Sequence, residues 1–107
     1  MKNNQNSSLE IEQVILNKKK FDLAEEVLYR EVENEAILLH IPTGTYYGLS
    51  ETSILFWKAL QEKQPLKPVV EQIIQEYDVE RAQVMQDLQT FLEDLLEAGI
   101  IVNSKHT

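Results

Sequence analysis

The decapeptide PTGTYYGLSE, residues 42–51, joins a stretch of β-type sequence to a stretch of helical sequence. Pro42 has no backbone N–H to donate, so it ends the strand that precedes it. Gly44 allows the chain to reverse into a short strand rich in tyrosine, residues 45–49. Ser50 is a suitable N-cap for the helix that follows. The decapeptide therefore predicts a turn, a strand and a helix start, in that order.

The sequence before this turn predicts a β-hairpin. Two runs rich in β-branched and aromatic residues, 27–32 and 36–41, flank the tripeptide Glu33-Asn34-Glu35. Asn34 tolerates the positive φ that a tight hairpin needs. Together with residues 45–49, these runs predict a three-stranded antiparallel meander.

The rest of the chain has helical periodicity and predicts three helices. We expect them to end near Lys63, Tyr77 and Ala98. Asp78 is a candidate N-cap for the third helix, and Gly99 is a good residue to follow its end. The predicted fold class is α+β and winged-helix-like, with a three-stranded antiparallel sheet followed by three helices.

The third predicted helix has an unusually wide apolar face. Its apolar residues are Val84, Met85, Leu88, Phe91, Leu92, Leu95, Leu96 and Ala98. They cover an arc of about 160°, whereas a helix that faces a core needs only about 100°. Two interpretations remain open: the helix is central and buried on two sides, or one flank forms a functional groove.

The composition is that of one acidic domain. The chain has 107 residues, 43% of them hydrophobic, and a net charge of −8. We expect a partly disordered N-terminal extension over residues 1–20, one domain over residues 21–103 and a tail over residues 104–107. The absence of cysteine from the sequence rules out disulfides and cysteine metal sites.

The negative charge disfavours nucleic-acid and membrane partners. Affinity for nucleic acid depends on lysine and arginine displacing counterions, and anionic membranes attract the same cations. The chain begins with a polar stretch and has no apolar run of about 20 residues, so we expect a cytoplasmic location. A winged helix would present residues 80–98 to DNA, yet Arg81 is the only base in that range, against several acids. A DNA-binding transcriptional regulator therefore remains only an alternative.

Catalytic motifs do not occur in the sequence. The chain has two histidines, His40 in a predicted strand and His106 in the tail, and no phosphate-binding glycine loop. We expect no enzyme activity, no cofactor and no metal site.

The tyrosine strand, residues 45–49, is instead a candidate binding edge. An uncovered edge strand can accept an extended peptide, with main-chain hydrogen bonds supplying affinity. Gly48 would allow close approach, and the apolar flank of the third helix would floor the pockets. Alternatively, the exposed edge makes a homodimer, and the apolar segment 9–21 pairs with this strand in its own or in a neighbouring copy.

Two stretches of the chain, residues 36–60 and 76–101, resemble the PqqD family. The matching motifs are Thr43-Gly44, Tyr46, Leu49, Phe56-Trp57, Tyr77-Asp78-Val79, Asp87-Leu88, Phe91-Leu92, Leu95 and Gly99-Ile100-Ile101. Each motif is weak alone, but their order and spacing are specific over about residues 27–102. One departure is Ser50, where the family usually has asparagine.

The resemblance implies a RiPP recognition element that binds the leader of a ribosomally made precursor peptide. Its partner would be a modifying enzyme, such as a radical-SAM protein or a leader peptidase and cyclase. In that family the leader adds as a strand beside the third strand and lies against the third helix. Carried onto this sequence, the peptide-binding residues are Thr45, Tyr46, Tyr47 and Gly48 on the strand and Val84, Asp87, Leu88 and Phe91 on the helix. Asp87 could meet a lysine or arginine of the leader.

Overall fold

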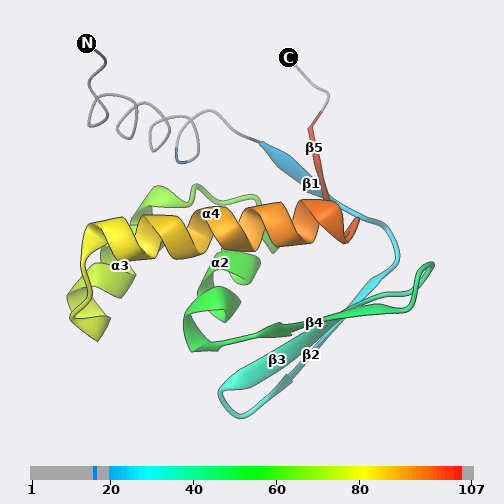
Figure 1. Ribbon diagram of the computed structural model, residues 1–107, viewed down its shortest axis with the longest axis horizontal. Coiled ribbons are helices and arrows are strands. Elements are labelled where there is room, and N and C mark those ends of the chain that lie inside the picture. The colour runs from blue at the N-terminus through cyan, green and yellow to red at the C-terminus, as the bar shows by residue number, and fades with distance from the viewer. Residues whose placement is uncertain (1–15, 17–19, 105–107) are drawn as a thin grey trace.

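The computed structural model describes residue 16 and residues 20–104 (Figure 1). The main sheet contains β2 (Val27–Val32), β3 (Glu35–His40) and β4 (Thr45–Leu49), and the helices α2 (Glu51–Gln61), α3 (Lys67–Tyr77) and α4 (Arg81–Glu97) follow it. A second sheet pairs β1 (Phe21–Leu23) with β5 (Ile101–Asn103). The predicted fold class, three antiparallel strands followed by three helices, is confirmed.

The main sheet is an antiparallel meander in the order β2-β3-β4. Val32 pairs with Glu35, so the first hairpin has a two-residue loop. The positive φ of this loop, 57°, falls on Glu33, and Asn34 does not share it. The expectation that Asn34 adopts positive φ was wrong, because the register places Glu33 at the first central position of the turn.

The described part of the segment 9–21 does not pair with β4. Phe21 begins β1, which pairs antiparallel with β5. The carbonyls of Ile100 and Lys20 extend this pairing by accepting from the amides of Ala24, at 2.8 Å, and Ser104, at 2.9 Å. Leu16 is buried, and residues 9–15 and 17–19 of the predicted segment lie outside the described residues.

Two of the three residues predicted to begin or end a helix do so as expected. Ser50 caps α2, because its side chain accepts from the amide of Ser53 at 3.3 Å. Gly99 follows α4 with a φ of 78°, as a helix-ending glycine does. Asp78 is not the N-cap of α4: it takes the left-handed conformation and ends α3, whereas Glu80 precedes α4 without a side-chain cap. Aspartate tolerates this conformation better than most residues.

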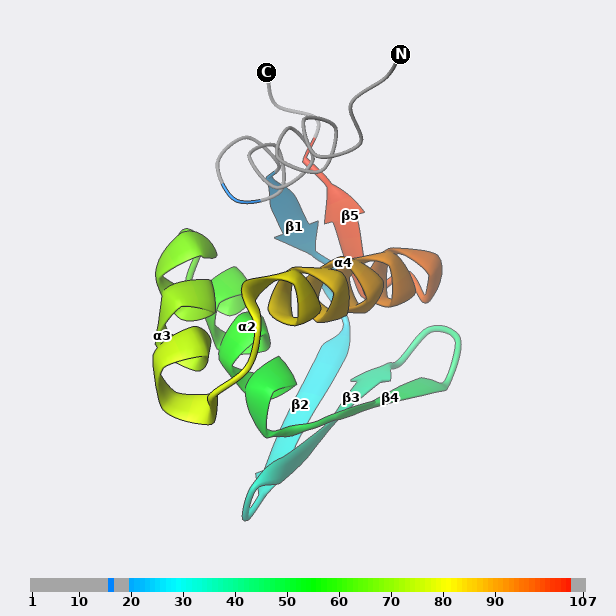
Figure 2. The same cartoon turned by 60° about the vertical axis from the view of Figure 1, so that its left-hand side comes forward.

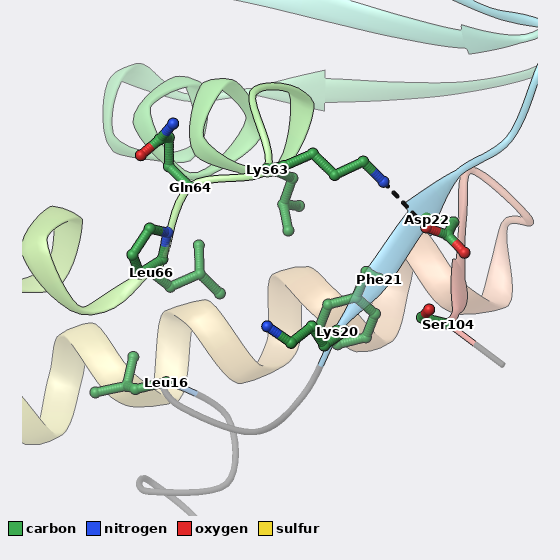
Figure 3. A pocket seen from close by; sticks show the side chains of 10 residues that line it. Leu16, Lys20, Phe21, Asp22, Lys63, Gln64, Leu66 and Ser104 are labelled. Atoms are coloured by element: carbon green, nitrogen blue, oxygen red, sulfur yellow. Dashed lines mark hydrogen bonds and ion pairs between the residues drawn. The ribbon is translucent and has the colours of Figure 1, made fainter. Parts of the chain in front are cut away.

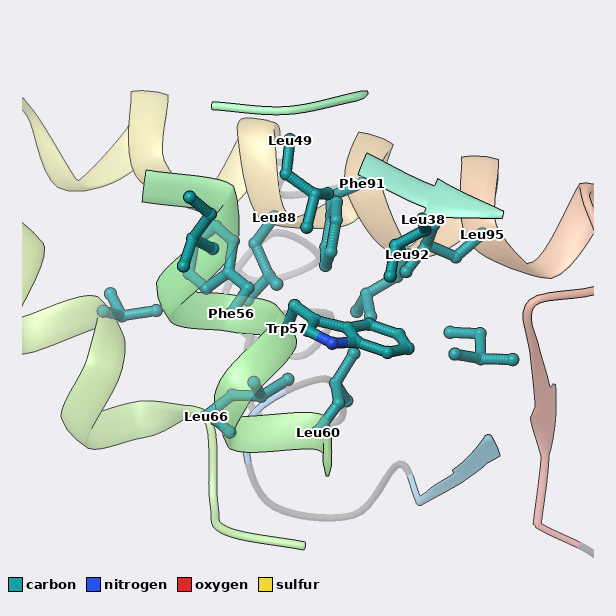
Figure 4. Close-up of a cluster of buried hydrophobic side chains, with 14 of the residues drawn as sticks. Leu38, Leu49, Phe56, Trp57, Leu60, Leu66, Leu88, Phe91, Leu92 and Leu95 are labelled. Atoms are coloured by element: carbon teal, nitrogen blue, oxygen red, sulfur yellow. The ribbon is translucent and has the colours of Figure 1, made fainter. Parts of the chain in front are cut away.

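Helix α2 is the centre of the core, in contact with β3, β4, α3 and α4 (Figure 2). Its Phe56 and Trp57 are each 2% exposed, and the ring of Phe56 lies 5.8 Å from that of Phe91 on α4 (Figure 4). The buried residues of α4 are Val84, Leu88, Phe91, Leu92 and Leu95, and Met85, Leu96 and Ala98 are partly buried. Most of the wide apolar arc therefore packs in the core.

No helix in the described part of the chain is long and apolar enough to cross a membrane.

Candidate functional site

Strand β4 has a free edge. It is the last strand of the sheet order β2-β3-β4, so no described strand pairs with its second side. Antiparallel strands alternate between residues that bond to one neighbour and residues that bond to the other. The amide of Ile41 donates to the carbonyl of Glu26 at 2.9 Å, so odd-numbered residues of β3 bond toward β2 and even-numbered ones toward β4. Tyr47 therefore bonds inward, whereas Tyr46 and Gly48 turn their N–H and C=O groups to the free edge.

The side chains of β4 divide between the two faces of the sheet. Tyr46 is 70% exposed on the outer face. Tyr47 points toward α4, where its hydroxyl donates to Asp94 Oδ2 at 3.0 Å and its ring lies 6.1 Å from that of Phe91. At Gly48, an added Cβ would share the outer face with Tyr46 and would meet nothing within 4 Å, so that face is open there.

A network of side chains fixes the start of β4. The Thr43 hydroxyl lies 2.9 Å from Nδ1 of His40 and donates to Oγ1 of Thr45 at 2.9 Å. The amide of Thr45 in turn donates to Oγ1 of Thr43 at 3.3 Å. Thr45 is therefore held by the turn, and by the same alternation its backbone, like that of Tyr47, bonds inward to β3.

The predicted helix-side residues have very different exposures. Leu88 is completely buried, and Val84 and Phe91 are each 3% exposed. Asp87 is exposed and accepts from Nε2 of Gln83 at 2.9 Å. Leu88 thus belongs to the core, and among the four predicted helix residues only Asp87 has an exposed side chain.

A hollow of about 250 Å³ lies beside the point where β4 passes into α2. Its lining comes from three helices and the loop after α3: Thr52, Phe56, Ile73, Tyr77, Val79, Gln83, Val84 and Asp87. The floor is apolar and the rim is polar, an arrangement that suits a side chain of a bound peptide. Sequence reasoning missed Thr52, Tyr77 and Gln83, because their only shared property is tertiary proximity.

The electrostatics of the site are set by carboxylates on α4. Burial, together with the hydrogen bond to Asp94 and its charge, raises the pKa of Tyr47 to about 12. The hydroxyl therefore keeps its proton at neutral pH and remains a donor. Asp87, one rim residue of the hollow, adds a solvent-exposed negative charge to the same helix.

The outer face of the main sheet is a second apolar surface. A shallow depression of about 690 Å³ crosses it from β2 to β4. The exposed apolar residues of this outer face are Leu28, Val32, Ile37, Ile41 and Tyr46, and Leu39 is half-buried among them. Sequence reasoning missed this surface, although the alternation of Ile37, Leu39 and Ile41 placed all three on one side of β3.

A third depression, of about 380 Å³, lies between the β1–β5 sheet and the end of α2 (Figure 3). An ion pair of 3.0 Å between Lys63 Nζ and Asp22 Oδ1 crosses it. Among the residues that the structure describes, no group of three or more His, Cys, Asp or Glu side chains is placed to hold a metal.

Comparison with known proteins identifies the family. The family described as "Coenzyme PQQ synthesis protein D (PqqD)" matches residues 35–101. A solved structure, "TbiB1 in Complex with the TbiA(beta) Leader Peptide", is 30% identical with a TM-score of 0.66, and the match covers 80% of this chain and 98% of that chain. Another, "Lasso peptide synthetase B1 complexed with the leader peptide", is 25% identical with a TM-score of 0.68, covering 78% of this chain and 98% of that one. No curated protein matches. The resemblance inferred from the sequence motifs is confirmed, and the chain belongs to the PqqD family.

Proposed function

We propose that this chain is a non-catalytic binding protein that captures the leader of a ribosomally synthesised precursor peptide and presents it to a modifying enzyme. The observation that carries the proposal is the free edge of β4, where Tyr46 and Gly48 offer unpaired backbone groups beside α4. An extended peptide satisfies such an edge by adding as a fourth strand. Two similar proteins of known structure hold leader peptides, which supports the same role here.

The hollow lies near one end of the proposed peptide edge. A peptide strand antiparallel to β4 would have its N-terminal end beside Leu49, which leads into α2, and Thr52 of α2 lines the hollow. An apolar or aromatic side chain of the leader, just before its paired residues, fills the hollow over Phe56 and Val84. Asp87 at the rim pairs with a lysine or arginine of the leader. Main-chain bonds at Tyr46 and Gly48 hold the strand, and the hollow selects the sequence.

The outer face of the sheet is where the modifying enzyme docks. Ile37 is 49% exposed and Tyr46 is 70% exposed, and apolar area of this kind is buried in protein interfaces. Tyr46 contributes its backbone to the peptide edge and its side chain to this face, so the two surfaces are continuous. An enzyme on the outer face would lie next to the captured leader, in the cytoplasm where the precursor is made.

The alternative of a DNA-binding regulator has no electrostatic support. Arg81, the single base of α4, is engaged with Glu71 on α3. The exposed acids Asp87, Glu93 and Glu97 on the same helix would repel phosphate.

The proposal is tested with a fluorescent synthetic peptide that carries the leader of the cognate precursor. We expect a Kd in the micromolar range or tighter by fluorescence anisotropy. Gly48→Pro removes the outward N–H without touching the β3–β4 ladder, and we expect it to weaken binding at least about tenfold. Gly48→Ala keeps the N–H and is the matched variant that still binds.

A proline on the opposite edge separates edge pairing from general damage. Glu31 lies on β2, and its N–H points to the other free side of the sheet by the same alternation. Glu31→Pro therefore leaves leader affinity unchanged if β4 is the binding edge. Equal affinities for wild type and Gly48→Pro, or no binding by wild type at all, would overturn the proposed function.

A further inference from the structure

The hydrogen bond between Tyr47 and Asp94 joins β4 to α4 directly. It links residues 47 positions apart in the sequence, at 3.0 Å in a partly buried site. The ring centroid of Tyr47 lies 6.1 Å from that of Phe91, and the ring centroid of Phe91 lies 5.8 Å from that of Phe56 in the core. Tyr47 thus anchors the middle of the edge strand to the most central helices.

The anchor does not occupy the peptide edge. Tyr47 bonds inward to β3 through its backbone, and its side chain passes beneath the strand toward α4. The groups that face an incoming peptide belong to Tyr46 and Gly48. Tyr47 can therefore control the separation of β4 from α4 without itself contacting the peptide backbone.

The hydrogen bond from Tyr47 to Asp94 is a strong one. Its acceptor is a carboxylate, and hydrogen bonds to charged groups are stronger than those between neutral partners. Burial and the neighbouring Asp94 raise the pKa of Tyr47 to about 12, so the hydroxyl keeps its donor proton even in mildly alkaline solution.

We propose that Tyr47 and Asp94 are a positioning pair that sets the separation between β4 and α4 and so preforms the groove for the peptide. The inference rests on the proposed function and adds two residues that act through geometry. A groove held open at the right width does not have to be ordered when the peptide binds, and this preorganisation increases affinity. The resemblance implied that Tyr47 contributes to the peptide edge, whereas here its side chain acts through Asp94, a residue that none of the family motifs includes.

The test compares hydroxyl removal at two tyrosines that each donate to a carboxylate, Tyr47 on β4 and Tyr29 on β2, using the fluorescent synthetic leader. Tyr47→Phe keeps the ring on Phe91 and loses only the bond to Asp94. We expect it to weaken binding about fivefold to tenfold, mainly through faster dissociation. Tyr29→Phe removes a hydroxyl that also donates to a carboxylate, Oε1 of Glu31 at 2.8 Å, but it lies on β2 and away from the β4 edge, so its Kd stays within about twofold of wild type.

Variants at Asp94 distinguish positioning from loss of a charge. Asp94→Asn keeps an oxygen that accepts from Tyr47, so it binds nearly as wild type, whereas Asp94→Ala matches Tyr47→Phe. The double variant Tyr47→Phe with Asp94→Ala is no weaker than either single variant, because both remove the same bond. Thermal unfolding monitored by circular dichroism verifies that each variant is folded at the assay temperature.

A measurement without peptide keeps this inference separate from the proposed function. The Cζ resonance of ¹³C-labelled Tyr47 reports its hydrogen bond in the free protein, and Asp94→Ala shifts it while Asp94→Asn does so much less. If wild type binds the leader and Tyr47→Phe binds equally well, the proposed positioning role of Tyr47 and Asp94 is wrong, whereas the proposed function stands. If wild type does not bind the leader, both the proposed function and the positioning role are wrong, whatever the Cζ resonance shows.

Discussion

Asp87 and Leu88 are consecutive residues of α4 with opposite surroundings: Leu88 is completely buried, and Asp87 is exposed at the rim of the hollow. Leu88→Ala therefore leaves a cavity in the core, and we expect a loss of about 3 kcal/mol in the free energy of unfolding. Asp87→Ala changes that free energy by less than about 0.5 kcal/mol. Urea denaturation of the two variants measures the difference, and similar losses would contradict this division of α4 between core and rim.

The outer face predicts a variant that separates the two proposed surfaces. Ile37→Glu places a charge among the exposed apolar side chains of β2, β3 and β4. Because Ile37 is 49% exposed, we expect the fold and the leader affinity to remain, and docking of the modifying enzyme to fail. Anisotropy with the leader measures leader affinity, and a pull-down with the cognate maturation enzyme measures docking. Loss of leader binding in this variant would argue against two separate surfaces.

The end of α4 depends on Gly99. Its φ is 78°, and an added Cβ would lie 3.3 Å from Cε1 of His40. Gly99→Ala thus combines an unfavourable backbone conformation with a crowded neighbour, and we expect a loss of about 1–2 kcal/mol in unfolding free energy. Gly48→Ala is the matched control, since its Cβ meets open space. Chemical denaturation that finds the two alanines equivalent would contradict the crowding at His40.

The cap of α2 predicts how substitutions at Ser50 behave. Its hydroxyl accepts from the amide of Ser53, so Ser50→Ala leaves that amide without its cap and costs about 1 kcal/mol. Asparagine caps helices as well as serine does, so Ser50→Asn keeps the stability of wild type. Thermal denaturation of both variants decides whether the side-chain oxygen is what matters.

Alkaline pH weakens the fold through two tyrosines. Burial, reinforced by hydrogen bonds to carboxylates, raises the pKa of Tyr29 and of Tyr47 from 10.0 to about 12. Because the protonated forms are favoured in the folded state, their contribution is complete below pH 10 and is lost as the pH rises to about 12. We expect the unfolding free energy to fall across this window, and to fall less steeply in the double variant Tyr29→Phe, Tyr47→Phe. A slope unchanged in that variant would contradict the assignment.

Local sequence signals predicted the strands and helices well where the backbone preferences of individual residues decide where an element starts or ends. Pro42 and Gly44 end one strand and start the next, and Ser50 begins a helix, as the structure confirms. The prediction for Asp78 failed, because the same short carboxylate that caps one helix also tolerates the left-handed conformation that ends another. Which of the two it does depends on the path of the chain between α3 and α4.

The sequence by itself determined the order of the strands and helices, the family and the strand that could serve as an edge. These follow from backbone preferences and side-chain periodicity, which act between neighbours along the chain. Only the tertiary structure decided that β1 pairs with β5 instead of covering β4, that Leu88 is core while Asp87 is rim, and that Tyr47 reaches Asp94. Those outcomes depend on packing between residues far apart in the chain, where no local preference selects the partner.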